Sequence, residues 1–222
     1  MTRLLVLVLL PLLLLAGCTR EYEWQQKLIV TVETPMGQRS GESVLAGQMR
    51  VADSALLPPE ARGAFISLQG EAVVVEVAPG RYLFALLNGM PYPFRVFFPD
   101  EAPVDVANRV ETLRDSRKLS PKNYPFMVTF DDVTDPTTVR QVDPLNLAAS
   151  FGPGVALTSV TLEMTDESRT SGKLKAVLGW IDQAKFIIPP GTQRRLAADL
   201  TFEQRLMPQD FIDWRTLKDM RD

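Results

Sequence analysis

The sequence has 222 residues, a formal net charge of −3, no histidine and one cysteine. Without histidine the chain cannot use Ser-His-Asp or Cys-His catalysis, or an H-E-x-x-H zinc site. Its charges leave no basic stripe of the kind that binds nucleic acid, so we expect no nucleic-acid partner. Hydrophobic residues make up 45% of the chain, which is enough for a packed core without disulfides.

The first eighteen residues have the order of a secretory signal peptide. Arg3 precedes an apolar run over residues 4–16, and small residues then lead to the single cysteine, Cys18. As a helix this run reaches only roughly 20 Å, which is less than the bilayer core of about 30 Å. Residues 1–17 are therefore predicted to be a signal peptide and not a membrane span.

The end of this segment, Leu15, Ala16, Gly17 and Cys18, resembles the lipobox of bacterial lipoproteins. The resemblance implies cleavage before Cys18 and lipidation of this residue with acyl chains such as palmitate. Two or three acyl chains anchor a protein stably in a membrane. Because Thr19 and not an aspartate follows, the sorting pattern of such lipoproteins favours the periplasmic face of the outer membrane over the inner membrane. An ordinary signal peptide that leaves a free Cys18 thiol is the alternative.

After the signal peptide we expect a lipidated tether at residues 18–26 and a single periplasmic body at residues 27–222. The best candidate for an internal boundary is the break at 119–125. Apolar and polar residues alternate at 27–33, which predicts a half-buried strand, and 43–51 is the next predicted strand.

Residues 71–78 and 81–87 form the clearest unit of the chain. Runs rich in valine and aromatic residues lie on either side of Pro79 and Gly80, a pattern typical of a β-hairpin. Both faces of the two predicted strands are apolar. We therefore expect this hairpin to lie centrally in a sheet that is covered on both sides.

An aromatic–proline segment follows at residues 88–99, with Tyr92, Phe94, Phe97 and Phe98. If exposed, these four rings would form a hydrophobic surface suited to a protein partner. The alternative is a buried crossing between layers of the fold.

Further along the chain, residues 104–118 have the apolar spacing of an amphipathic helix. Strands are predicted at 126–130 and 157–164, and helices at 145–150 and 207–222. These elements predict a mainly β fold, with sandwich-like antiparallel sheets and two or three accessory helices; an α+β fold is the alternative.

Four acidic residues, Asp131, Asp132, Asp135 and Asp143, come close together in the sequence. Calcium takes six to eight oxygen ligands, so this cluster is a candidate calcium site, although its spacing does not match an EF-hand. Turn and cap formation is the alternative interpretation, because aspartate starts turns and caps helices. No other cofactor is expected.

Several short motifs of the body are similar to a family of uncharacterised lipoproteins of proteobacteria. The motifs are at residues 71–75, 81–87, 128–132, 135–136, 142–144, 148–152 and 154–155. Because no activity is established for that family, the resemblance implies none for this chain.

The sequence therefore favours a membrane-anchored periplasmic lipoprotein that acts as a non-catalytic interaction or structural protein of the envelope, with an unidentified envelope protein as partner. A small-ligand or calcium-binding module at residues 131–143 is the first alternative. A carboxylate-based hydrolase of envelope polymers is the second. It would need two facing acids in a cleft, one with a raised pKa, and the sequence identifies no such pair.

Overall fold

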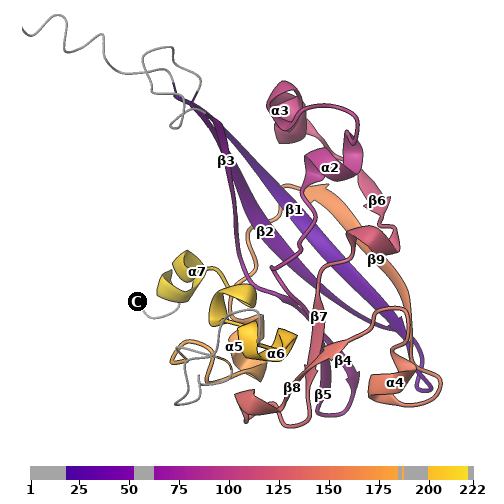
Figure 1. The fold of residues 1–222 in the computed structure, drawn as a ribbon. Coiled ribbons are helices and arrows are strands. Elements are labelled where there is room, and N and C mark those ends of the chain that lie inside the picture. Colours follow the sequence, from indigo (N-terminus) through magenta and orange to yellow (C-terminus); the bar gives the residue numbers. More distant parts are fainter. Residues whose placement is uncertain (1–18, 53–62, 185–186, 188–199, 220–222) are drawn as a thin grey trace, which may run out of the picture.

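The computed structural model of the chain describes residues 19–52, 63–184, 187 and 200–219. Within these residues the strands form two antiparallel sheets, of five and four strands, with several short helices around them (Figure 1). The predicted mainly β fold is confirmed. The predicted signal peptide and Cys18 lie outside the described residues.

The larger sheet has the strand order β3-β2-β1-β9-β6. Its strands are β1 (Thr19–Glu33), β2 (Arg39–Ala52), β3 (Gly63–Gln69), β6 (Ser116–Lys118) and β9 (Ala156–Thr165). β1 and β2 form a long ribbon that pairs from Thr19, opposite Ala52, to Val32, opposite Arg39. Residues 19–26, which we expected in the tether, instead form the first half of β1, because each of them has a partner in β2.

The smaller sheet has the strand order β4-β5-β7-β8. Its strands are β4 (Val73–Ala78), β5 (Arg81–Ala85), β7 (Met127–Phe130) and β8 (Val139–Val142). β4 and β5 form the predicted hairpin. Gly80 in its turn has a φ of 72°, in the left-handed region where glycine is favoured.

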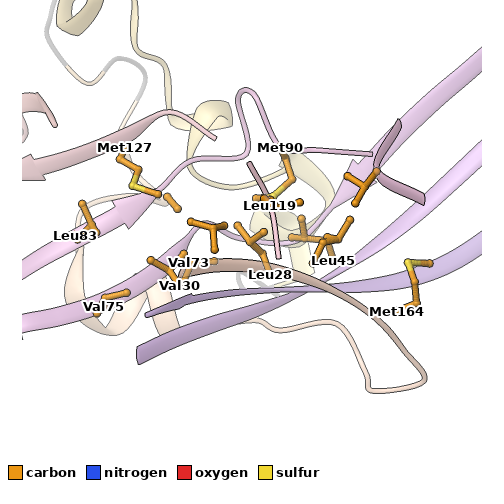
Figure 2. Close-up of a cluster of buried hydrophobic side chains, with 14 of the residues drawn as sticks. Leu28, Val30, Leu45, Val73, Val75, Leu83, Met90, Leu119, Met127 and Met164 are labelled. Carbon is orange, nitrogen blue, oxygen red and sulfur yellow. The ribbon is translucent and has the colours of Figure 1, made fainter. Parts of the chain in front are cut away.

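The two sheets face each other across a hydrophobic cluster that we call the inner core. Leu28 and Val30 of β1 and Leu45 of β2 meet Val73 and Val75 of β4 there (Figure 2). All five side chains are buried, so this cluster provides much of the hydrophobic stabilisation of the sandwich. The helices α2 (Pro93–Phe97) and α3 (Pro103–Thr112) extend the inner core toward the N-terminal half of the β1–β2 ribbon.

The opposite face of the smaller sheet packs against the C-terminal part of the chain, which we call the outer layer. Its elements are α5 (Lys173–Val177), α6 (Phe202–Arg205), the 3-10 turn η5 (Pro208–Asp210) and α7 (Trp214–Asp219) (Figure 1). Phe84 and Phe130 of the sheet contact Phe211 at ring-centroid distances of 6.4 and 6.0 Å, within a second hydrophobic cluster, the outer core. The prediction of a sheet covered on both faces is thus confirmed. The hairpin does not lie centrally in it, because β4 is an edge strand of the smaller sheet.

The chain between β9 and the outer layer is fixed by buried polar residues. Lys27, itself buried, forms an ion pair with Glu163 at 2.9 Å and a second one with Glu167. These two carboxylates, Glu167 first, raise the pKa of Lys27 above its ordinary value, so the amine stays charged. At the start of α5, the Glu71 carboxylate accepts hydrogen bonds from the N–H groups of Gly172 and Lys173, both at 2.9 Å.

Three predicted helices are shorter in the structure. The helix expected at 104–118 ends at Thr112, and residues 116–118 pair with β9 as strand β6. The helix expected at 207–222 is divided into η5 and α7. The one expected at 145–150 is the single turn α4 (Ala148–Phe151). The remaining short turns are η2 (Pro121–Asn123) and η3 (Pro136–Thr138).

Candidate functional site

The first two acids of the candidate calcium site use their carboxylates on neighbouring groups. Asp131 forms an ion pair with Arg140, at 2.5 Å. Asp132 accepts hydrogen bonds from the hydroxyl and the N–H of Thr134, at 2.7 and 2.9 Å. These two bonds, the hydroxyl first, lower the pKa of Asp132. Both carboxylates therefore stabilise the turn that follows β7.

The other two acids have the same kind of role. Asp135 caps η3 by accepting hydrogen bonds from the N–H and hydroxyl of Thr137, at 2.9 and 2.7 Å. Asp143 accepts the N–H of Leu145 at 2.8 Å. In the described part of the chain no three His, Cys, Asp or Glu side chains are placed to hold a metal ion. The contacts support the turn and cap interpretation over the calcium site.

The aromatic–proline segment does not present the expected surface of four exposed rings. Phe94 and Phe97 are buried in the inner core, while Tyr92 and Phe98 are half-buried. Tyr92 stacks on Phe94 at 5.2 Å between ring centroids, and the Arg109 guanidinium covers Phe98 at 4.1 Å. Phe94 and Phe97 therefore do not form part of an exposed surface, because they pack within the inner core. A buried crossing is the better description.

The structure contains a cleft that the sequence did not predict. It has a volume of about 680 Å³ and lies where five parts of the chain meet. These parts are β3 at residues 66–68, the loop at 87–92, α2 at residues 95–96, the turn η2, and the outer layer at 209–214. Figure 1 shows β3 beside α7, where the larger sheet meets the outer layer. A cleft of this size can hold a small ligand or a segment of polypeptide.

The hydrogen bonds of the larger sheet show which backbone groups of β3 face this cleft. In an antiparallel sheet, successive residues of a strand bond alternately to the neighbour on one side and on the other. The N–H and C=O of Val44 in β2 bond to Thr170, at 2.9 and 3.0 Å, on the side away from β1. Even-numbered residues of β2 therefore bond toward β3. Since Gln48 lies opposite Ser67, the odd-numbered residues of β3 bond back to β2.

The even-numbered residues of β3 consequently direct their N–H and C=O groups away from the sheet. Gly70, just beyond β3, follows this pattern, because its carbonyl accepts the N–H of Asp213 at 3.0 Å. Ile66 and Leu68 direct the same groups toward the cleft, and these groups have no hydrogen-bond partner in the described residues. Their side chains pack against the inner core, which fixes the backbone in place.

The opposite wall of the cleft is firmly attached to the sandwich. The N–H of Leu87 donates to the carbonyl of Asp210 at 2.8 Å, and the N–H of Ala72 donates to the carbonyl of Phe211 at 2.7 Å. Both bonds join the smaller sheet to the outer layer. The cleft is therefore lined by two backbone segments that other contacts hold apart.

The floor of the cleft is a turn at residues 87–90. The N–H of Met90 donates to the carbonyl of Leu87 at 3.0 Å, which closes a β-turn. Gly89, at the third position of this turn, has a φ of 79°, a positive value that favours glycine there. The buried amide of Gln26 then donates to the carbonyl of Pro91 at 3.0 Å. A side chain of β1 thus fixes the position of this loop.

The charged residues of the cleft come from two different parts of the fold. Arg95 of α2 and Lys122 of η2 have no side-chain hydrogen bond or ion pair within the described residues. Asp210 and Asp213 belong to the outer layer, and each already accepts backbone N–H groups there, at 2.7 Å from Met207 and 2.9 Å from Arg215. The two cations are therefore the groups most available to a ligand.

The strongest candidate for a carboxyl with a raised pKa lies outside this cleft. Burial raises the pKa of Glu71, and hydrogen bonds from Leu174, Gly172 and Lys173 only partly oppose that effect. Glu71 is fully buried and does not line the cleft. The pair of acids in a cleft, one of them with a raised pKa, that the hydrolase hypothesis requires is thus not formed by Glu71.

No protein-family model, curated protein or solved structure matches this chain. In the part of the chain that the structure describes, no helix is long and apolar enough to cross a membrane. The fold and the cleft, with the sequence of the first eighteen residues, are therefore the observations from which function has to be inferred.

Proposed function

We propose that this chain is a lipid-anchored protein of the bacterial envelope that binds another protein through the cleft beside β3, without catalysing a reaction. The observation that carries the proposal is the cleft itself. Its lining includes the backbone groups of Ile66 and Leu68 and the cations Arg95 and Lys122, all without a partner among the residues that the structure describes. Backbone groups with fixed geometry and uncompensated charges are what a protein partner can recognise.

The anchoring part of the proposal rests on the lipobox-like segment that ends at Cys18. Cellular fractionation tests it. The native chain should be found in the outer-membrane fraction, and mass spectrometry of its N-terminal peptide should show a cysteine modified with diacylglycerol. The Cys18→Ala variant should lose both properties. Membrane association of Cys18→Ala together with an unmodified native cysteine would refute the lipid anchor.

Site-specific photo-crosslinking in living cells tests the binding part. Trp214 lines the cleft and has 63% of its surface exposed, so benzoylphenylalanine can replace it with little disturbance. The same probe at Leu145, which has an exposed fraction of 72% and does not line the cleft, is the matched control. We expect an adduct of one defined mass from position 214 only. Equal adducts from both positions, or none from either, would contradict the proposal.

A further inference from the structure

We infer that the cleft binds its partner as an extended, acidic peptide segment that adds to the larger sheet as a sixth strand beside β3. This inference rests on the proposed function, and it names the chemistry of the partner and its mode of binding. Three features support it: the backbone groups of β3 that have no partner in the described residues, the absence of charged residues and proline from this strand, and the cations of the cleft.

The first feature is the geometry of the edge. Ile66 and Leu68 each direct one N–H and one C=O toward the cleft, two residues apart in the strand. An extended chain laid alongside would meet this spacing with every second residue of its own backbone. The side chains of Ile66 and Leu68 pack against the inner core, which holds the backbone of β3 in place.

The second feature is the sequence of β3, Gly-Ala-Phe-Ile-Ser-Leu-Gln, which contains neither a charged residue nor proline. Proteins commonly protect a free edge with charges, proline, a very short strand or a covering segment. The other edge of the same sheet follows that rule, because β6 has three residues and includes Arg117 and Lys118. In the smaller sheet, the edge strand β8 is covered by Glu203, which accepts the N–H of Gln141 at 3.2 Å.

The third feature is charge. Arg95 of α2 and Lys122 of η2 line the cleft without a partner in the described part of the chain. Asp210 and Asp213 keep their negative charges, but they lie in the outer layer, where each already accepts a backbone N–H group. A peptide with a carboxylate side chain or a C-terminal carboxylate near these cations would therefore be preferred.

The aromatic rings of the cleft favour a peptide over an oligosaccharide. One face of Tyr92 is stacked on Phe94, and the Arg215 guanidinium lies 5.3 Å from the ring centre of Trp214. Each ring therefore has one face already covered. The free backbone groups of Ile66 and Leu68 match those of another strand in spacing and direction, which sugar hydroxyls do not.

The test uses the purified chain and a displayed library of random peptides of about nine residues, a normal strand length. Selected peptides should be rich in Asp and Glu and in residues that favour strands. At about one hundred times the dissociation constant, hydrogen exchange of the Ile66 and Leu68 amides should slow by about a hundredfold. The Ser67 amide is the internal control: it already bonds to β2, so its exchange should be unchanged.

Two matched comparisons separate strand addition from other binding. N-methylation of one alternate set of peptide amides should abolish binding, and N-methylation of the other set should leave it intact, without any change to the protein. The double variant Arg95→Gln and Lys122→Gln should bind the selected peptides about threefold to tenfold more weakly, because exposed ion pairs have effects of this order.

The inference is overturned if no peptide is selected, if bound peptides leave the Ile66 and Leu68 amides unprotected, or if both N-methylated sets bind equally. Binding of glycan strands without peptide stems in place of peptides would assign the cleft to a glycan and also overturn it. If position 214 crosslinks to a partner in cells while these peptide tests fail, the proposed function stands without strand addition. If peptides bind as expected but nothing crosslinks, the proposed function fails and the edge site remains.

Discussion

The two faces of the four-stranded sheet contact hydrophobic cores that are built in different ways. The inner core is closed by a second sheet, whose long strands hydrogen-bond to each other residue by residue. The outer core is closed by short helices and loops, which depend on a few individual bonds. Among these are the Glu71 cap of α5 and the bond of 2.8 Å from the Trp180 indole to the carbonyl of Val133.

This difference indicates that the two halves of the molecule have different cooperativity. A ladder of strand pairs opens only when many bonds break together, whereas a layer of short helices can open locally. The cleft lies between the two halves, since β3 packs on the inner core and residues 209–214 belong to the outer layer. A mutation in the inner core should therefore affect the cleft through β3, and a mutation in the outer core should affect it through residues 209–214.

The largest effect is expected for Phe211→Ala, because Phe211 is fully buried and contacts two other aromatic rings of the outer core. Removing a buried phenylalanine side chain typically lowers the free energy of unfolding by about 3–5 kcal/mol. Hydrogen exchange should show loss of protection at Leu178 and Leu217 in the outer layer, and retained protection at Leu28. Equal loss at all three amides would mean that the two cores unfold as one unit.

Leu28→Ala should give a uniform loss of protection and not one confined to the outer layer. Leu28 lies at the centre of the inner core (Figure 2), and its truncation should lower the free energy of unfolding by about 2–5 kcal/mol. Leu28 belongs to the core that joins the two sheets, so its loss should weaken both of them. Amides of both sheets and of the outer layer should therefore exchange faster together. Denaturant unfolding with a single transition would agree with this, and loss confined to the outer layer would contradict it.

A smaller effect is expected at the junction between the two cores. Glu71→Ala leaves the partly buried N–H groups of Gly172 and Lys173 without their acceptor, at a cost of about 1–3 kcal/mol in the free energy of unfolding. Glu71→Gln has nearly the same shape and keeps one acceptor oxygen, so it should lose less. Chemical denaturation of the three proteins checks this order, and equal stability of the alanine and glutamine variants would disprove the capping role.

The same residue should make stability depend on pH. Burial raises the folded-state pKa of Glu71 above its ordinary value of 4.5. The folded state therefore holds this proton more tightly than the unfolded state, and the stability that Glu71 contributes is greatest below its ordinary pKa. As the pH rises through the raised pKa, the free energy of unfolding of the native protein should fall relative to that of Glu71→Gln. A difference that does not change from mildly acidic to neutral pH would contradict the raised pKa.

The smallest change in stability is expected for the cleft cations. Arg95→Gln and Lys122→Gln remove exposed charges with no partner in the described residues, so the free energy of unfolding should change by no more than about 0.5 kcal/mol. Thermal unfolding checks this. A larger loss would mean that these cations stabilise the fold, and that weaker peptide binding by the double variant could not be assigned to the cleft.

The parts of the fold that are determined by local pattern could be predicted from the sequence. The alternation at 27–33 and the two apolar runs around Gly80 gave a strand and a hairpin that the structure confirms. Both patterns are local: they depend on which neighbouring side chains are apolar and, for the hairpin, on the turn residues Pro79 and Gly80.

Elements that depend on distant partners could not be predicted in this way. Residues 116–118 continue the helical spacing of α3, but pairing with β9 makes them a strand. In the region expected as a C-terminal helix, Pro208 begins a separate turn and the Asp213 carboxylate accepts the N–H of Arg215 at the start of α7. Proline is tolerated at the first position of a helix, so Pro208 does not cause the division. Residues 211–213 instead bond to the segment 70–72, through the carbonyl of Phe211 and the N–H of Asp213, and apolar spacing cannot reveal these distant partners.

The cleft was missed for a related reason. Its walls come from segments as far apart in the sequence as Ile66 and Trp214, and the free backbone groups of β3 leave no trace in side-chain type. The one signal in the sequence is the uncharged strand at 63–69, which becomes informative only when it is known to lie at an edge.

The early start of β1 sets how far the cleft can be from the bilayer. Trp24 lies opposite Gly47, which in turn lies opposite Leu68 at the cleft. Five residues of strand and two strand spacings separate Thr19 from this point, a distance of about 20 Å. If Cys18 carries the proposed lipid, the binding edge stays within roughly this height of the headgroups at any tilt of the body. A partner must then be a membrane protein with an extended tail near its surface, or a soluble one able to approach the lipid directly.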